Sequence, residues 1–170
     1  MKAFFKNSRT GEDTPFTTEF TLEKKDGFFE VEYKCKNSKF YSANTGYNTP
    51  IYEGDVCEIF ISLADDIYTY YEIEVAPNNS VFFKKVVNKG DKRQAFAEEN
   101  TLKTSVEING NDYTVKMIIP YASVNYDVNK GAYFNAYRIE TEGGYRDKNL
   151  LALNPTMSDT FHQPDKFIKL

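Results

Sequence analysis

Apolar and polar side chains alternate along most of this chain, and no long stretch has the three-to-four-residue spacing of an amphipathic helix. A period of two is typical of half-buried β-strands, because successive side chains point to opposite faces of a sheet. Asp26-Gly27 and Asn109-Gly110 separate pairs of alternating segments, and both dipeptides favour the tight turn of a hairpin. The sequence therefore predicts an all-β protein built largely from antiparallel hairpins.

The alternating segments define the predicted strands. They cover residues 16–23, 28–35, 55–62, 70–76, 80–87, 102–108, 113–119 and 132–141. About eight to ten short strands separated by turns are typical of an antiparallel β-sandwich, with a jelly-roll or immunoglobulin-like arrangement of two sheets. The length of 170 residues suits one domain spanning 1–170.

Three connections are less regular. The polar residues 88–100 predict a short helix or an irregular loop, and residues 121–130 predict a connection with one helical turn. The final segment contains Pro155 and Pro164 and is expected to be extended and packed over one end of the sandwich.

Charge and hydrophobicity exclude several classes of function. The net charge is −4, and the basic pairs such as Lys84-Lys85 stand isolated among acids, so nucleic-acid binding is not expected. No apolar run reaches membrane-spanning length, so no membrane partner is expected. The first residues lack the apolar core of a signal peptide, which predicts a cytoplasmic protein if Met1 is the natural start.

Cys35 and Cys57 are the only cysteines in the chain. Two cysteines make neither a disulfide framework nor, without nearby histidines, a metal cluster. Both fall in predicted strands, so we expect two small buried thiols, and the sequence leaves a bond between them open.

Glu58 is the first candidate binding residue. It shares one face of its strand with Val56 and Phe60, and a carboxylate between apolar side chains needs a partner. Sugar hydroxyls could be that partner, with Tyr52 in the preceding loop offering an aromatic face to the C–H groups of a sugar ring. The alternative is that Glu58 pairs with a core arginine and Tyr52 caps the sandwich.

Arg138 is the predicted partner of Glu58. It shares a strand face with Phe134 and Ala136, and its planar fork suits either a carboxylate or two adjacent hydroxyls. Asn154 offers an amide that can donate to and accept from a hydroxyl. His162, the only histidine, either lines the same site or serves as a structural hydrogen-bonding group.

Paired carboxylates raise the question of glycoside hydrolysis. Asp55 and Glu58 form one such pair, and Glu72 and Glu74 form another. Hydrolysis needs two carboxyls on either side of a cleft, whereas Glu72 and Glu74 share one strand face that we expect to be solvated. No nucleophile pattern accompanies His162 either, so the sequence does not predict an enzyme.

Four phrases in fixed order resemble family 9 carbohydrate-binding modules. They are 52–61 (Tyr-Glu-Gly-Asp-Val-Cys-Glu-Ile-Phe-Ile), 70–79 (Tyr-Tyr-Glu-Ile-Glu-Val-Ala-Pro-Asn-Asn), 134–140 (Phe-Asn-Ala-Tyr-Arg-Ile-Glu), and 153–156 (Leu-Asn-Pro-Thr) with 161–164 (Phe-His-Gln-Pro) and Phe167. The resemblance spans about residues 50–170 and extends to related domains of the same sandwich type. It implies a β-sandwich that binds sugar without catalysis.

The resemblance also implies roles for particular residues. Tyr52 falls where the family has a stacking tryptophan, and Glu58 falls where it has a glutamate that contacts the ligand. The chain departs from the family near Asn154, where a second tryptophan completes an aromatic clamp, because it has leucines there and no tryptophan anywhere. The nearby tyrosines could replace that wall. They are Tyr41, Tyr47 and Tyr145.

Structural calcium is a further implication of the resemblance, since family members often carry it. The available oxygen ligands are Asp26, Glu12-Asp13 and Asp65-Asp66, none with a recognisable loop spacing. No other cofactor is expected, and the metal ligands stay unassigned.

The leading expectation is a non-catalytic domain that binds a mono- or oligosaccharide end in a cleft, in polysaccharide catabolism and with an accessory role beside a glycoside hydrolase. Two alternatives stay open. One is an interaction domain whose sugar site has degenerated, because the tryptophans are missing. The other is a haem-binding, cytochrome-like domain using ligands such as His162, Met117 or Met157, although Met117 has the strand position of a core residue.

Overall fold

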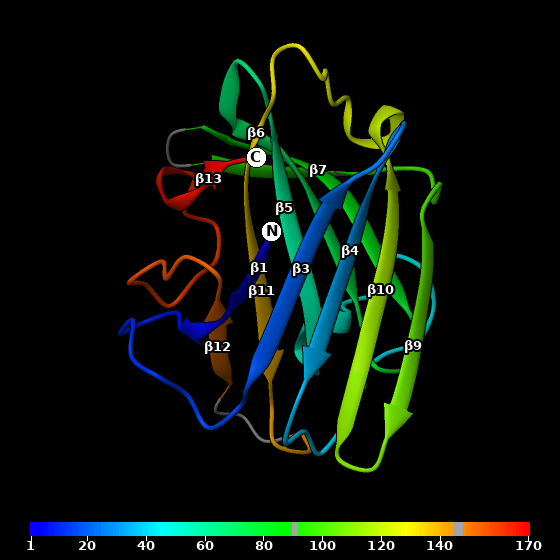
Figure 1. Ribbon diagram of the computed structural model, residues 1–170, viewed down its shortest axis with the longest axis vertical. Coiled ribbons are helices and arrows are strands. Elements are labelled where there is room, and N and C mark those ends of the chain that lie inside the picture. The colour runs from blue at the N-terminus through cyan, green and yellow to red at the C-terminus, as the bar shows by residue number, and fades with distance from the viewer. Residues whose placement is uncertain (90–91, 145–147) are drawn as a thin grey trace.

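The computed structural model describes residues 1–89, 92–144 and 148–170, which form two antiparallel β-sheets packed face to face (Figure 1). The smaller sheet has the strand order β1-β3-β4-β10-β9. Its strands are β1 (Lys2–Phe4), β3 (Thr18–Lys24), β4 (Phe28–Cys35), β10 (Asp112–Pro120) and β9 (Lys103–Asn109).

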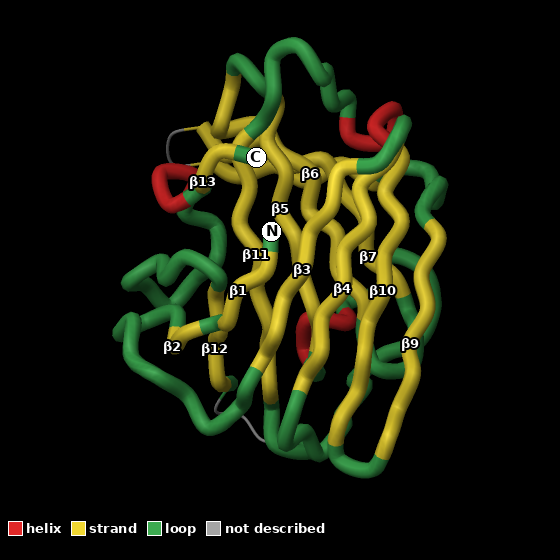
Figure 2. Tube along the Cα trace, in the orientation of Figure 1, coloured by secondary structure: helices red, strands yellow, loops and turns green. Residues whose placement is uncertain are grey.

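The larger sheet has the order β2-β12-β11-β5-β6-β7-β8, and β13 pairs with β11 beside this path. Its strands are β2 (Lys6–Asn7), β12 (Asn149–Ala152), β11 (Tyr133–Glu140), β5 (Val56–Leu63), β6 (Asp66–Val75), β7 (Val81–Lys89), β8 (Lys92–Ala97) and β13 (Ile168–Lys169). The helical segments are short 3₁₀ turns (Figure 2). They are η1 (Ile51–Glu53), η2 (Tyr121–Val124) and η3 (Pro164–Lys166). None of the helices in the described ranges has the length and apolar character needed to span a membrane.

The predicted antiparallel β-sandwich is confirmed, and the predicted hairpin turns join β3 to β4 and β9 to β10. One prediction was wrong. Residues 88–100, expected to be a helix or loop, contain the strand β8, which pairs with β7 at the edge of the larger sheet. All six side chains of β8 are exposed. The strand is therefore held by backbone hydrogen bonds and leaves no apolar alternation in the sequence.

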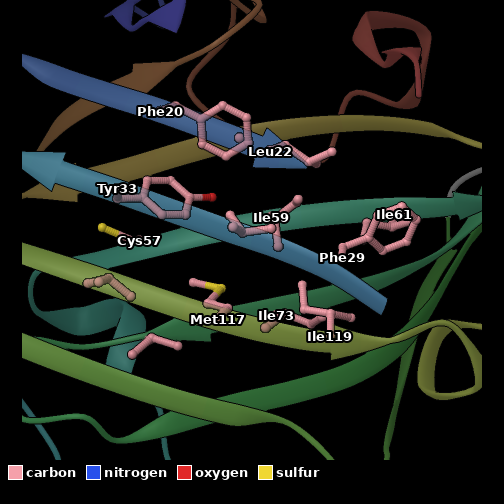
Figure 3. Close-up of a cluster of buried hydrophobic side chains, with 14 of the residues drawn as sticks. Phe20, Leu22, Phe29, Tyr33, Cys57, Ile59, Ile61, Ile73, Met117 and Ile119 are labelled. Atoms are coloured by element: carbon pink, nitrogen blue, oxygen red, sulfur yellow. The ribbon is translucent and has the colours of Figure 1, made fainter. Parts of the chain in front are cut away.

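The main core lies between the sheets (Figure 3). The apolar face of β5 supplies Cys57, Ile59 and Ile61, which pack against side chains of β3, β4 and β10 such as Phe20 and Met117. These are the side chains that the two-residue period of β5 assigned to one face. The opposite face of β5 is therefore turned away from this core.

A second apolar cluster covers that opposite, outer face of the larger sheet. It joins Phe60, Tyr70 and Tyr137 on the strands to Phe161 and Phe167 in the final segment of the chain. Phe161 stacks on Tyr137 with ring centroids 4.3 Å apart. The final segment was expected over one end of the sandwich, but it packs on the outer face of the larger sheet, because aromatic side chains there need cover.

Candidate functional site

A cleft of about 420 Å³ opens on the outer face of the larger sheet, beside the final segment. Its floor is a row of side chains that follows the strand register. Tyr137 on β11 lies opposite Glu58 on β5, Glu58 lies opposite Glu74 on β6, and Glu74 lies opposite Phe82 on β7. In the neighbouring row, Glu72 lies between Phe60 and Lys84. The three glutamates and Phe82 line the cleft, whereas Tyr137 is buried beneath Phe161. The cleft therefore has three carboxyls on its floor, with Phe82 at one end of the first row and Phe161 above the other.

The three glutamates form a compact acidic cluster that we call the glutamate triad: Glu58, Glu72 and Glu74. Their exposed fractions are 3%, 7% and 1%, and one carboxylate oxygen from each lies within 4.8 Å of the other two. Oε2 of Glu74 is buried without a hydrogen-bond partner. The expectation that Glu72 and Glu74 are solvated was wrong, because loops and the final segment enclose the outer face of the sheet at this point.

Burial disfavours the charged form of all three carboxyls. It raises the pKa of Glu72 to about 7, and nearby Arg93 and Lys84 offset only part of that effect. Burial also raises the pKa values of Glu58 and Glu74 well above the ordinary value, and each negative neighbour raises them further. Lys148 acts in the opposite direction on both. The triad therefore holds protons near neutral pH unless a positive or hydrogen-donating group enters the cleft.

His162 lines the cleft and is held by the aromatic cluster. Its ring stacks on Phe60 at 5.2 Å, and its Nδ1 lies 2.7 Å from the hydroxyl of Tyr70. Nε2 lies 3.7 Å from Oε1 of Glu72, but burial and the charge of Arg93 lower the pKa of His162 to about 3. The imidazole is therefore neutral at physiological pH, and it does not supply the positive charge that Glu72 lacks.

Tyr52 stands at the β7 end of the cleft. It lies in η1, where buried Ile51 anchors the turn, and its ring meets Phe82 edge-on at 5.6 Å. Its carbonyl accepts a hydrogen bond from Nζ of Lys148 at 2.6 Å. Because its side chain is 42% exposed, an aromatic face is available beside the triad.

The residues just after Tyr52 fix its position. Buried Asp55 accepts hydrogen bonds from the backbone N–H groups of Tyr41 at 2.8 Å and Thr141 at 2.7 Å, so it joins two loops to the start of β5. A Cβ on Gly54 would collide with the carbonyl oxygen of Tyr41 and lie 2.7 Å from the nitrogen of Ala43. The phrase that carries the family resemblance thus contains a tightly packed loop junction as well as a candidate ligand contact.

Arg138 does not belong to the cleft. It lies opposite Cys57 in the register and therefore points between the sheets, whereas Glu58 points outward. Its guanidinium donates to Glu140 Oε2 at 2.6 Å and to Thr18 Oγ1 at 3.1 Å. The expected pairing of Glu58 with Arg138 was wrong, because Arg138 lies opposite Cys57, one residue before Glu58, and the two side chains point to opposite faces of the sheet. Arg138 forms a buried ion pair with Glu140 instead.

Asn154 also lies away from the cleft lining. Its side-chain amide donates to the carbonyl of Lys166 at 2.8 Å, and its backbone exchanges hydrogen bonds with the side chain of Asn135. These contacts fasten the final segment to β11. Of the five predicted site residues, the structure thus brings Tyr52, Glu58 and His162 together in the cleft and leaves Arg138 and Asn154 outside it. Contact of the first three with a ligand stays a prediction.

The aromatic wall opposite Tyr52 comes from Phe161, which lines the cleft at the β11 end. Tyr41 and Tyr47, proposed as replacements for the missing tryptophan, lie outside the lining, and Tyr145 falls outside the described residues. Adjacent strands are roughly 4.8 Å apart, so the row from β11 to β7 spans about 14 Å. That span leaves room for a sugar ring between Phe161 and Tyr52.

Sequence reasoning missed several lining residues, among them Glu74, Phe82, Lys84, Arg93 and Lys148. Strand alternation places Phe82 and Lys84 on one face of β7, as it does Glu72 and Glu74 on β6. What it does not reveal is which strand lies beside which, or that Arg93 and Ala95 of β8 and Lys148 line this face. The sequence indicates these residues only through the alternation of Glu72 and Glu74 with apolar side chains in residues 70–76.

Three of the acids suggested as calcium ligands are paired with lysines. Asp65 is paired with Lys130 at 3.0 Å and Asp66 with Lys89 at 2.8 Å, while Asp13 is paired with Lys6. Calcium takes six to eight oxygen ligands, and carboxylates already bound to lysines do not make such a cage.

The sulfur and imidazole groups suggested for haem do not converge either. Met117 is buried between the sheets, Met157 is exposed, and His162 lies on the outer face of the larger sheet. An axial ligand pair must face one iron from two sides. The haem alternative is therefore not favoured.

The fold is a β-sandwich, and one of its sheets carries a cleft lined by acidic, basic and aromatic side chains. This is the architecture of a module that binds a small ligand. The sequence comparison gives the family: residues 2–170 match the carbohydrate family 9 binding domain-like family. The chain belongs to this family. It is a family of non-catalytic binding modules, which agrees with the expectation that the protein is not an enzyme.

Relatives share the fold across most of the chain. A family 9 module from Caldicellulosiruptor kristjanssonii, solved with cellotriose, is 16% identical and has a TM-score of 0.70 over 99% of this chain and 80% of its own. Its complex with glucose gives 0.66 at 16% identity over 98% and 82%. A candidate carbohydrate-binding protein from Bacteroides uniformis gives 0.76 at 18% identity over 91% and 78%. A protein of Arthroderma benhamiae named "Extracellular protein" is 29% identical over 82% of this chain and 71% of its own length.

Proposed function

We propose that the cleft binds the end of a mono- or oligosaccharide without catalysis. Tyr52 and Phe161 face the apolar C–H surfaces of the sugar, Glu58 accepts hydrogen bonds from its hydroxyls, and His162 completes the lining. The observation that carries the proposal is the row in which the outward carboxyls of β5 and β6 stand between Phe161, which covers Tyr137 of β11, and Phe82 of β7. Sugars combine apolar faces with a belt of hydroxyls, and this arrangement matches both.

The positions of the carboxyls support binding over hydrolysis. Glu58 and Glu74 are neighbours on adjacent strands, so they stand side by side on the cleft floor. A glycosidase holds its two carboxyls on opposite sides of the bond that it cleaves. The family membership and the binding of glucose and cellotriose by the Caldicellulosiruptor relative support the same proposal.

Isothermal titration calorimetry tests it with glucose, galactose, cellobiose, cellotriose, xylobiose and lactose. We expect micromolar to millimolar binding of at least one sugar. Glu58→Gln should weaken it at least about tenfold, because a hydrogen bond to a charged group is lost. Tyr52→Ala should weaken it about fivefold through lost ring contact.

Tyr133→Ala is the matched control for Tyr52→Ala, since Tyr133 is 38% exposed and lies outside the cleft lining. The proposal fails if folded protein gives no heat with any of these sugars. It also fails if Tyr52→Ala and Tyr133→Ala are indistinguishable from the unmodified protein in affinity. Such a result would favour the alternative of an interaction domain whose sugar site has degenerated.

We also propose that this binding serves a glycoside hydrolase by holding it on its substrate. A non-catalytic module raises the local concentration of an attached catalyst at the chain that it binds. Fused to a hydrolase, the protein should increase hydrolysis of an insoluble polysaccharide, and the Glu58→Gln fusion should not. Equal rates for the two fusions would contradict this part of the proposal.

A further inference from the structure

The glutamate triad places three carboxyls at one point of the cleft, more than the binding of neutral hydroxyls requires. Glu58, Glu72 and Glu74 are each more than nine-tenths buried, and their carboxylate oxygens converge within 4.8 Å. Taking carboxylates out of water is costly unless each has a compensating partner. Among the described residues, no lysine or arginine forms an ion pair with any of the three within 4.0 Å, and neutral His162 does not compensate Glu72.

Glu74 is a second and independent observation at the same place. It is 1% exposed, it lines the cleft, and its Oε2 lacks any hydrogen-bond partner. Unpaired buried oxygens are rare because each one costs free energy of desolvation, so such an atom calls for an explanation. A donor that enters the cleft with a ligand would supply the missing partner.

The geometry favours a particular donor. An ammonium group directs its N–H bonds tetrahedrally and makes charge-assisted hydrogen bonds of about 2.8 Å, so three acceptors around it are separated by roughly 4.6 Å. One carboxylate oxygen from each member of the triad lies within 4.8 Å of the other two, so a single ammonium group placed between them can reach all three. Oxygens bound directly to calcium lie at 2.3–2.6 Å from the ion, and calcium needs three to five more oxygen ligands. The other side-chain oxygens of the lining are few, since Asp159 is paired with Arg9 at 2.6 Å and Thr160 offers a hydroxyl.

We infer that the cleft recognises an amino sugar with a free, protonated amine, whose ammonium group is bound by the glutamate triad while its ring packs between the aromatic walls. The inference rests on the proposed function and names the ligand class for the same site. The triad ionises as the ammonium binds, so complex formation releases protons from the protein. Burial and mutual repulsion, which raise the pKa values of these carboxyls, make that release measurable near neutral pH.

The test compares glucose, glucosamine and N-acetylglucosamine by titration calorimetry at about pH 7, where the amine of an amino sugar is protonated. Glucosamine should bind at least about tenfold more tightly than glucose, because a charge-assisted contact replaces a neutral one. N-acetylglucosamine keeps the nitrogen but not the charge, so it should lose the preference. Titrations in two buffers of different ionisation enthalpy should detect more protons released by glucosamine than by glucose.

Glu74→Gln supplies the decisive variant. It keeps the shape of the side chain and removes one charge, so the preference for glucosamine over glucose should be lost. The readout is the ratio of the two affinities, because Glu74 also lines the cleft in which glucose binds. Glu72→Gln is a second variant should Glu74→Gln fold poorly. Glu107→Gln is the matched control, because Glu107 is exposed on β9 in the other sheet and should leave the preference intact.

The outcomes separate the two proposals. If glucose binds and glucosamine binds no better, the amino-sugar inference is overturned and the proposed function stands. If calcium chloride alone gives saturable heat that Glu74→Gln removes, and glucosamine shows no preference, the triad is a cation site instead. If no sugar binds at all, both proposals fall.

Discussion

Glu58 and Glu74 lie directly opposite each other on neighbouring strands, and both are buried. Like charges at such a position repel each other, so this cross-strand pair would destabilise the larger sheet if both side chains were ionised. Glu72 lies two residues along β6 from Glu74 and adds to the repulsion. Ionisation of these side chains is therefore unfavourable in the free protein, and protonation or a bound ligand removes the repulsion.

Stability should fall as the pH rises across the neutral range. A carboxyl whose folded pKa is raised stabilises the fold fully below its unfolded value, and the contribution is lost as the pH rises through the folded value. For Glu72 this window runs from 4.5 to about 7, which corresponds to about 3 kcal/mol at full ionisation. Urea unfolding between about pH 5 and about pH 8 measures the slope, and Glu72→Gln should flatten it. Glu107→Gln should keep it, and a Glu72→Gln slope parallel to that of the unmodified protein would contradict the account.

His162 should stay neutral far below the ordinary pKa of histidine. Burial lowers its pKa to about 3, so its contribution is present above the unfolded value of 6.5 and is lost as the pH falls toward 3. This sign is opposite to that of the triad, so stability should be greatest at mildly acidic pH. Because the chain has one histidine, the proton on Cε1 of its ring gives a single NMR signal. Between about pH 8 and about pH 5 that signal should show only the small shift caused by titration of nearby Glu72, and the full shift of a protonating imidazole would refute the packing described for the ring.

Arg138→Met should destabilise the protein and spare its ligand. Loss of the arginine leaves Glu140 as an unpaired buried charge, and breaking such a pair costs about 3–5 kcal/mol. Chemical denaturation measures this loss, and calorimetry below the new melting temperature measures sugar affinity. Arg138 points between the sheets, so affinity per folded molecule should not change. A selective loss of affinity at unchanged stability would return Arg138 to the binding site.

Gly54→Ala should reduce both stability and affinity. The new Cβ would press on the backbone of the loop that contains Tyr41 and Ala43, which has to move. Because Asp55 and Tyr52 are neighbours of Gly54, that movement displaces the aromatic side chain at the end of the cleft. We expect a loss of about 1–3 kcal/mol in unfolding free energy, together with weaker sugar binding. Gly110→Ala is a comparison for affinity, since nothing lies within 4 Å of its Cβ position. Its φ of +62° disfavours any side chain, so this variant should lose stability and keep its affinity.

The two thiols should be inert in the folded, reduced protein. Cys35 and Cys57 are buried, and their sulfur atoms lie 3.5 Å apart between the sheets. A thiol reagent such as Ellman's reagent should label neither in native buffer and both in denaturant, because reaction needs access to the thiolate. Fast labelling of native protein would mean that the sheets separate at this end far more readily than their packing indicates.

Much of the fold could be predicted from side-chain alternation and turn dipeptides. The faces of β5 were assigned correctly, because a period of two is a local property that a sequence displays directly. The edge strand β8 was not predicted, since its exposed side chains carry no such pattern and only pairing with β7 orders it. The same limit applies to Arg138, whose face could be read from its strand but whose partner could not.

The sequence by itself determined that the chain forms antiparallel strands, that Glu58 points away from the main core, and that the family motif surrounds it. Only the tertiary structure decided that Glu74 on β6 stands beside Glu58, that Phe161 returns from the end of the chain to wall the cleft, and that Arg138 faces the other way. The physical reason is that strand order and register bring together residues far apart in sequence. Burial, which sets the charge of the triad, exists only once those neighbours are in place.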